Sequence, residues 1–127
     1  MHLAILDAII QKKAGGIFVA KFETTVYGDF RQVLTKIEDG ILSGSITASL
    51  EDSSDFRSGD ARCSVRVFER YSYMGSNRVS LSVTVFQNGN DPIKVSAITS
   101  GGSQALFFKV NTLGEEAFLD KLREILE

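Results

Sequence analysis

The sequence GDFRQVLTKIEDGILSG, residues 28–44, stands between segments that alternate with a period of two, and it has a helical period instead. Asp29 and Gln32 match the N-cap and N3 positions of a capping box, and Gly40 or Gly44 can end the helix. The apolar residues recur at three- and four-residue spacing, which places them on one face of an α-helix: Phe30, Val33, Leu34, Ile37 and Ile41.

The segments on both sides of this helix alternate apolar and polar residues, which is typical of half-buried strands. The strands after the helix follow one another closely and predict an antiparallel meander. The expected core positions are Phe18, Phe22 and Val26 before the helix, and after it Ile46, Ala48 and Leu50; Ala61, Cys63, Val65 and Val67; Val79, Leu81, Val83 and Val85; Ile93, Val95 and Ala97.

Two turns can be placed by requiring that core residues face core residues. A loop at 88–90 pairs Val85 with Ile93. A tight Gly101–Gly102 turn pairs Ala97 with Leu106 and adds a further strand, because the residues after the glycines read as a strand. A phosphate-binding glycine loop would instead lead into a helix.

Both ends of the chain predict helices. Residues 112–127 have a capping box at their start and an apolar stripe that includes Leu122 and Leu126, which indicates a helix docked on the sheet. Residues 1–16 predict a short amphipathic helix and a linker, followed by a single domain over residues 17–127.

The expected fold is therefore α+β, in one domain of ordinary size. A single antiparallel sheet of about six strands, mostly a meander, is packed on one face by the internal helix and the C-terminal helix. The short N-terminal helix is added to this unit.

Composition excludes several classes of protein. A net charge of −2 gives no overall attraction to nucleic acid or to an anionic membrane, so we do not expect a nucleic-acid partner. The N-terminal apolar run has no basic residues before it and is shorter than the roughly 20 residues that span a bilayer, so no membrane span is expected. One cysteine allows no intramolecular disulfide, which fits the cytoplasm.

The residues needed for most catalysis are scarce. His2 is the one histidine and Cys63 the one cysteine, so we expect neither a catalytic site nor a zinc site, and no cofactor. Cys63 is expected to be buried, in phase with Val65. The acidic residues between 51 and 60 favour a solvated loop over a cation site, because their spacing fits no calcium loop.

A stripe of arginines is the more informative feature. Arg62, Arg66 and Arg70 recur every four residues, with Phe68 among them, on the strand face opposite Cys63; Phe86 is expected on the same face of the next strand. These residues are a candidate face for an anion or another partner. The alternative is a water-facing surface balanced by nearby acidic residues.

Two hypotheses of function follow, with an enzyme third. The first is a non-enzymatic binding or regulatory module that acts through its sheet face, or as a homodimer formed by the sheet or the N-terminal helix. The second is a carrier of a small apolar ligand. Its pocket would lie between the sheet and the C-terminal helix, lined by Phe22, Leu81, Phe108 and Phe118.

Three stretches carry a resemblance: LEDSSDFRSGDARCSVRVFERYSY (50–73), SAITSGGSQALFFK (96–109) and GEEAFLDKL (114–122). Together they resemble a family of small uncharacterised bacterial proteins, over residues 17–127. The resemblance implies no activity and no functional residues. The order of strand, helix, meander and C-terminal helix is also similar to the helix-grip architecture, whose members often hold apolar ligands.

Overall fold

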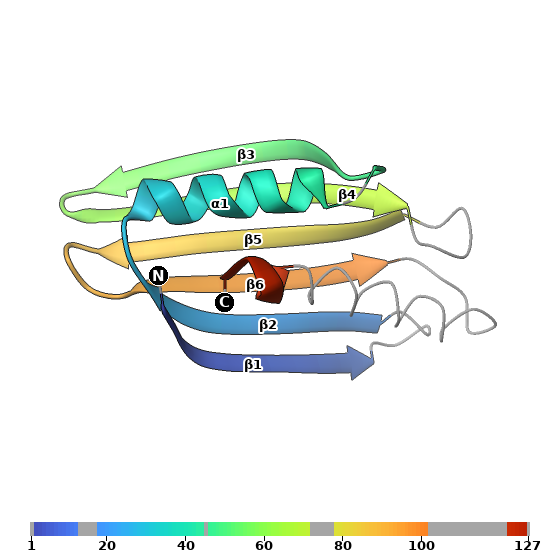
Figure 1. Ribbon diagram of the computed structural model, residues 1–127, viewed down its shortest axis with the longest axis horizontal. Coiled ribbons are helices and arrows are strands. Elements are labelled where there is room, and N and C mark those ends of the chain that lie inside the picture. The colour runs from blue at the N-terminus through green and yellow to red at the C-terminus, as the bar shows by residue number, and fades with distance from the viewer. Residues whose placement is uncertain (1, 13–17, 45, 72–77, 102–121, 127) are drawn as a thin grey trace.

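A computed structural model shows an α+β fold built on one open antiparallel sheet (Figure 1). It describes residues 2–12, 18–44, 46–71, 78–101 and 122–126, with side chains from residue 21 onward. The strands lie side by side in the order β1-β2-β6-β5-β4-β3. Their bounds are β1 His2–Lys12, β2 Phe18–Tyr27, β3 Ser49–Ser58, β4 Ala61–Tyr71, β5 Arg78–Asn88 and β6 Ile93–Gly101.

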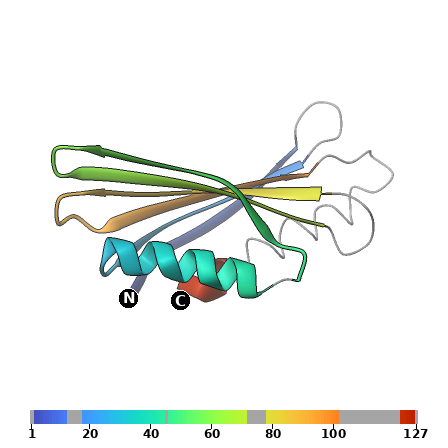
Figure 2. The same ribbon diagram turned by 90° about the horizontal axis from the view of Figure 1, so that it is seen from above.

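The helix α1, Phe30–Ser43, leaves β2 and crosses the sheet to reach β3 at the far edge. Figure 2 shows α1 and the helical residues 122–126 on the same side of the sheet. We call this side the helix face and the other side the open face. Within the described part of the chain, no helix is long and apolar enough to cross a membrane.

Both ends of α1 form as the sequence indicates. Asp29 is the N-cap and its carboxylate accepts a hydrogen bond from the backbone N–H of Gln32 at 3.0 Å. Gly44 is the C-cap, and its N–H donates to the carbonyl of Gly40 at 3.0 Å. The buried residues of α1 are the five predicted: Phe30, Val33, Leu34, Ile37 and Ile41.

One hydrophobic core lies between the sheet and the two helical segments. Its members from the sheet include Phe22, Leu81 and Val95, and the helical residues 122–126 contribute Leu122 and Leu126. The odd-numbered residues of β5 and β6 therefore face the helices, as their alternation predicts.

The N-terminal segment is not the predicted helix. Residues 2–12 form β1, which pairs with β2 along its whole length from His2 opposite Tyr27 to Lys12 opposite Phe18. An isolated helix of this length is marginal in water, whereas a strand here satisfies the outer edge of β2. The helix through which the sequence predicted one form of homodimer is therefore replaced by a strand.

The predicted acidic loop is also a strand. The predicted strand at 45–50 begins later, at Ser49, and continues as β3 through the acidic residues to Ser58, with Ile46 fully exposed before it. Residues 50–58 are all exposed. Because neither face of β3 is buried, its sequence lacks the alternation of apolar and polar residues by which a strand is recognised. Charged side chains on an edge strand discourage pairing with other sheets.

The β5–β6 hairpin is displaced by two residues from the predicted register. Val85 lies opposite Val95 instead of Ile93. The turn at Asn88–Asp91 sets this pairing, with Gly89 at φ +59 and the N–H of Asp91 donating to the carbonyl of Asn88 at 3.0 Å. A shift of two keeps every side chain on its face, so hydrophobic matching could not detect it.

The predicted Gly101–Gly102 hairpin is wrong. β6 pairs with β5 on one edge and with β2 on the other, where Ala97 lies opposite Phe22. Both edges of β6 are occupied by β2 and β5, and Ala97 lies between Phe22 and Val83. The strand predicted after Gly102 lies outside the described residues, and β1 was not expected, so the predicted set of about six strands is not confirmed.

The largest correction concerns the orientation of β4. Ser64, Arg66 and Phe68 face the helices and are buried, whereas Cys63 and Val65 lie on the open face and are half-buried. The prediction of a buried Cys63 is therefore wrong. The apolar residues of β4 are divided between the two faces, and the face that includes Phe68 is the one turned towards the core.

Arg66 is buried beneath α1, at 6% exposure, and is held by acidic groups from two neighbouring elements. Its Nε donates to Glu38 Oε2 of α1 at 2.6 Å, and its Nη1 donates to Asp55 Oδ1 of β3 at 3.0 Å. Nη1 also donates to the carbonyl of Val65 at 3.0 Å. This network joins α1, β3 and β4.

The charges in the network reinforce each other. Hydrogen bonds from the Ser64 hydroxyl at 2.6 Å and from Arg66 lower the pKa of the Asp55 carboxyl below its usual value. Burial alone would lower the pKa of Arg66, but its bonds to Glu38 and Asp55 outweigh that effect and raise it. The ion pairs therefore persist at every pH at which the carboxylates are ionised.

We expect Arg66→Met to lower the free energy of unfolding by about 2–3 kcal/mol, because it leaves the partly buried Glu38 carboxylate without its cation. Replacing both partners, as Arg66→Met with Glu38→Leu, should recover most of that loss. Urea unfolding measures both effects. A double variant as unstable as Arg66→Met would show that packing, and not charge, makes Arg66 necessary.

Gly40 lets the C-terminal helical segment approach α1. A Cβ added at this position would stand 2.5 Å from both Cγ1 and Cδ1 of Ile125, closer than carbon atoms can pack. The position tolerates no side chain unless Ile125 moves.

We expect Gly40→Ala to destabilise the protein by about 1–3 kcal/mol, the usual cost of overpacking. The same change inside an exposed helix stabilises by roughly 0.5–1 kcal/mol. In an Ile125→Ala background the clash is removed, so Gly40→Ala should then raise the melting temperature. A rise in the wild-type background would contradict this packing.

Candidate interaction surface on the open face of the sheet

The open face is formed by the side chains that alternate with the core residues. The register places these residues in rows that run across the strands. One row consists of Phe56, Cys63, Phe86, Lys94 and Thr25, taken from β3, β4, β5, β6 and β2 in turn.

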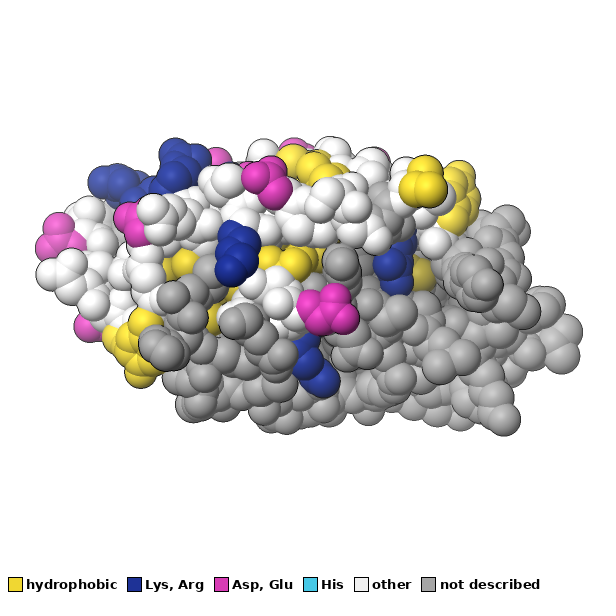
Figure 3. Space-filling view, viewed as in Figure 1, with side chains coloured by type: hydrophobic (Ala, Val, Ile, Leu, Met, Phe, Trp, Pro, Cys, Tyr) yellow, Lys and Arg dark blue, Asp and Glu magenta, His cyan; other side chains and the backbone are white. Residues whose placement is uncertain are grey.

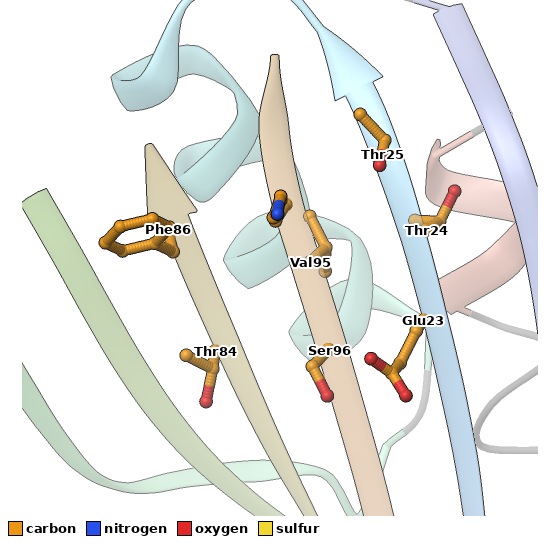
Figure 4. A pocket seen from close by; sticks show the side chains of 8 residues that line it. Glu23, Thr24, Thr25, Thr84, Phe86, Val95 and Ser96 are labelled. Carbon is orange, nitrogen blue, oxygen red and sulfur yellow. The ribbon is translucent and has the colours of Figure 1, made fainter. Parts of the chain in front are cut away.

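The next row has small side chains on β3 to β6 and a glutamate on β2. Ser54, Val65, Thr84, Ser96 and Glu23 lie opposite one another on the same five strands. Figure 4 shows Thr84, Ser96 and Glu23 on three neighbouring strands beneath Phe86. Because Thr84 and Ser96 are small, the surface is hollowed between Phe86 and Glu23.

Two hollows meet at Phe86. One, of about 510 Å3, lies over the middle of the face and is lined by Glu23, Thr84, Phe86 and Ser96 among others. The second, of about 250 Å3, lies towards β3 and includes Phe56 and Cys63. Phe86 lines both, so one aromatic ring stands between the two hollows.

Large apolar side chains stay in contact with water on this face. Phe56 is 64% exposed, Ile98 44% and Phe86 38%. Neither α1 nor the helical residues 122–126 lie on this side of the sheet (Figure 2). Phe56 and Phe86 lie in one row with Cys63 between them, and Ile98 lies two rows away on β6. The two aromatic rings in one row make this end of the face a candidate interaction surface.

The charges on the open face largely neutralise each other. Lys21 forms an ion pair with Glu23, with Nζ and Oε1 3.0 Å apart, and Arg78 forms one with Glu69. The surface therefore offers aromatic, aliphatic and hydroxyl groups, with Lys94 as a further cation opposite Phe86.

The predicted arginine face is not one surface. Arg66 and Phe68 are buried on the helix face, and the register places Arg62 and Arg70 on that face as well. Burial lowers the pKa of Arg70. Of the five predicted residues, Phe86 alone lies on the open face, because β4 is turned opposite to the prediction.

The predicted ligand pocket is only partly placed. Phe22 and Leu81 are fully buried in the core cluster that also contains Leu122 and Leu126. Phe108 and Phe118 lie outside the described residues. The pocket and the likeness to helix-grip proteins stay predictions.

The acidic residues of β3 do not gather into a metal site. In the part of the chain that is described, no three His, Cys, Asp or Glu side chains lie close enough together to hold an ion.

Phe56 and Ile98 are the residues that sequence reasoning missed. Phe56 was hidden in the supposed loop, and Ile98 falls on the polar side of β6. A sequence signal for Phe56 existed in the two residues Gly59 and Asp60, which join β3 to β4, with Gly59 at φ +57. Recognising this hairpin would have placed Phe56 opposite Cys63.

Comparison with known proteins places the chain in a family. Residues 19–127 match a family of unknown function (DUF6054), and the chain belongs to that family. The predicted resemblance to uncharacterised bacterial proteins is thereby confirmed. A comparison with curated proteins gives no match.

A solved structure shares the fold. It is a protein of unknown function from Pseudomonas aeruginosa, described as a candidate regulator, with a TM-score of 0.57 and 7% identity. The similarity covers 92% of this chain and 81% of the other. At this identity the likeness concerns the fold alone.

Proposed function

We propose that this member of the family is a non-enzymatic binding module of the cytoplasm that works by self-association, with a second copy of the chain packed on the open face. The observation that carries the proposal is the exposure of Phe56, Phe86 and Ile98 on a sheet face that α1 and residues 122–126 leave open. Burying these side chains would release about 25 cal/mol for each Å2 of apolar surface removed from water.

A second sheet fits this face in shape. Rows of hydroxyl and β-branched residues such as Val65, Thr84 and Ser96 make a shallow surface. Two such faces pack about 10 Å apart, with their side chains interdigitating. Phe86 would then enter the shallow hollow of the opposite copy, as symmetric interfaces allow.

The charges also favour a neutral partner. Ion pairs within the face already compensate Lys21 and Arg78. A single-stranded nucleic acid would need a row of uncompensated cations beside the aromatic rings, and the arginines expected to supply it are turned to the helix face. The similar Pseudomonas protein is described as a candidate regulator, which is compatible with a binding role.

We expect the wild-type protein to reach the mass of a dimer as its concentration rises in sedimentation-velocity experiments. Phe86→Glu should weaken the dimer at least about tenfold, or about 1.4 kcal/mol, because it places a carboxylate in an apolar interface. Leu42→Glu is the matched control, since Leu42 of α1 is 38% exposed like Phe86 but lies on the other side of the sheet.

Circular dichroism should show both variants folded. A wild-type protein that stays monomeric at millimolar concentration would refute the proposal. So would a dimer that Leu42→Glu weakens as much as Phe86→Glu does.

A further inference from the structure

Three arginines converge on the helix face, at the end of the sheet where α1 begins. Arg31 comes from the first turn of α1, Arg57 from the end of β3 and Arg62 from the start of β4. All three line a hollow of about 280 Å3, together with Asp55 and Ser64. Figure 3 shows basic side chains gathered at this end, where β3 turns into β4.

The register sets two of these arginines against each other. Arg57 and Arg62 are direct partners in the β3–β4 ladder, so both extend from the same side of the hairpin. Like charges in this arrangement are destabilising, and a sheet usually avoids them. An anion between the two guanidinium groups would turn this repulsion into attraction.

The protein supplies little charge to compensate them. No ion pair of Arg31, Arg57 or Arg62 is found within the described ranges. The carboxylate in the hollow, Asp55, already accepts hydrogen bonds from Ser64 at 2.6 Å and from Arg66 at 3.0 Å. Arg31 acts on Asp55 only through its charge, and weakly.

The hollow is held by rigid elements. The guanidinium of Arg62 lies over the ring of Phe30, with its Cζ 4.1 Å from the ring centroid, and Phe30 is buried at the start of α1. This stacking fixes the plane of Arg62 while leaving its N–H groups available at the edge.

We propose that this hollow binds a phosphate group, as inorganic phosphate or as the phosphate monoester of a small molecule. Planar guanidinium groups donate paired hydrogen bonds to phosphate oxygens, and three of them from different directions match a tetrahedral anion. A small ligand fits better than a nucleic acid, because the cations are confined to one hollow and the chain as a whole carries −2.

Phe56, Arg57 and Arg62 line this hollow and also the smaller hollow beside Phe86. The mass of each arginine variant is therefore measured by sedimentation velocity beside its phosphate binding, so that failure of one proposal is distinguished from failure of the other. Isothermal titration calorimetry of the full chain should use inorganic phosphate, glycerol phosphate and, as the uncharged control, glycerol. Sodium chloride keeps the ionic strength constant. Thermal unfolding under the same conditions gives a second measurement.

We expect the wild type to bind at least one phosphate compound and to melt at a higher temperature in its presence, and not to bind glycerol. Arg57→Gln should weaken binding at least about tenfold, which corresponds to one decade of Kd. Arg62→Lys should also weaken it, since it keeps the charge but loses the paired donors. The control is Arg78→Gln, which removes an ion-paired arginine from the open face and should bind like the wild type.

Without ligand, Arg57→Gln should melt no lower than the wild type, because it relieves the cross-strand repulsion. An unchanged melting temperature would show that Arg57→Gln loses binding without losing its fold. Tighter binding of glycerol phosphate than of phosphate would identify a small phosphorylated molecule as the ligand, and equal or weaker binding would identify the free anion. The proposal is overturned if neither compound binds the wild type, or if Arg57→Gln binds as tightly as Arg78→Gln.

Discussion

The orientation of β4 depends on one buried cation. A guanidinium cannot lose its charge in a protein, so Arg66 can face the interior only where carboxylates meet it. Glu38 of α1 and Asp55 of β3 both accept hydrogen bonds from the Arg66 guanidinium. Once Arg66 faces inward, the period of two sends Phe68 into the core and Cys63 to the open face. The ladder then places Phe56 on the open face and Arg57 on the other.

What the sequence could predict was local. The helix α1 follows from its period and from Asp29, and the alternation of β5 and β6 shows which of their residues are buried. Contacts between distant residues were out of reach. In β4 a count of apolar residues favours the face of Cys63 and Val65, and only the approach of Glu38, 28 residues away in the chain from Arg66, reverses it.

The other differences have the same origin. Residues 2–12 have enough aliphatic side chains for a helix or a strand, and the free edge of β2 decides between them. The Gly101–Gly102 hairpin matched its residues well but needed an edge of β6 that β2 occupies. For the candidate surfaces, sequence reasoning identified Phe86 and Arg62 but placed them together. The register places them on opposite faces of the sheet, although both line the hollow at the end where β3 turns into β4.

The orientation of β4 can be measured by thiol labelling of two proteins with one cysteine each. One is the wild type, with Cys63. The other carries Cys63→Ser and Ser64→Cys, which moves the thiol to the neighbouring position. Both are labelled in dilute solution, so that self-association does not cover the open face. We expect a bulky maleimide to label Cys63 in the folded protein, because it lies half-exposed on the open face. The thiol at position 64 should react only on unfolding, because Ser64 is 4% exposed beneath α1. Rapid labelling at position 64 together with protection at Cys63 would show that β4 faces the other way, and that Arg66 does not determine the fold.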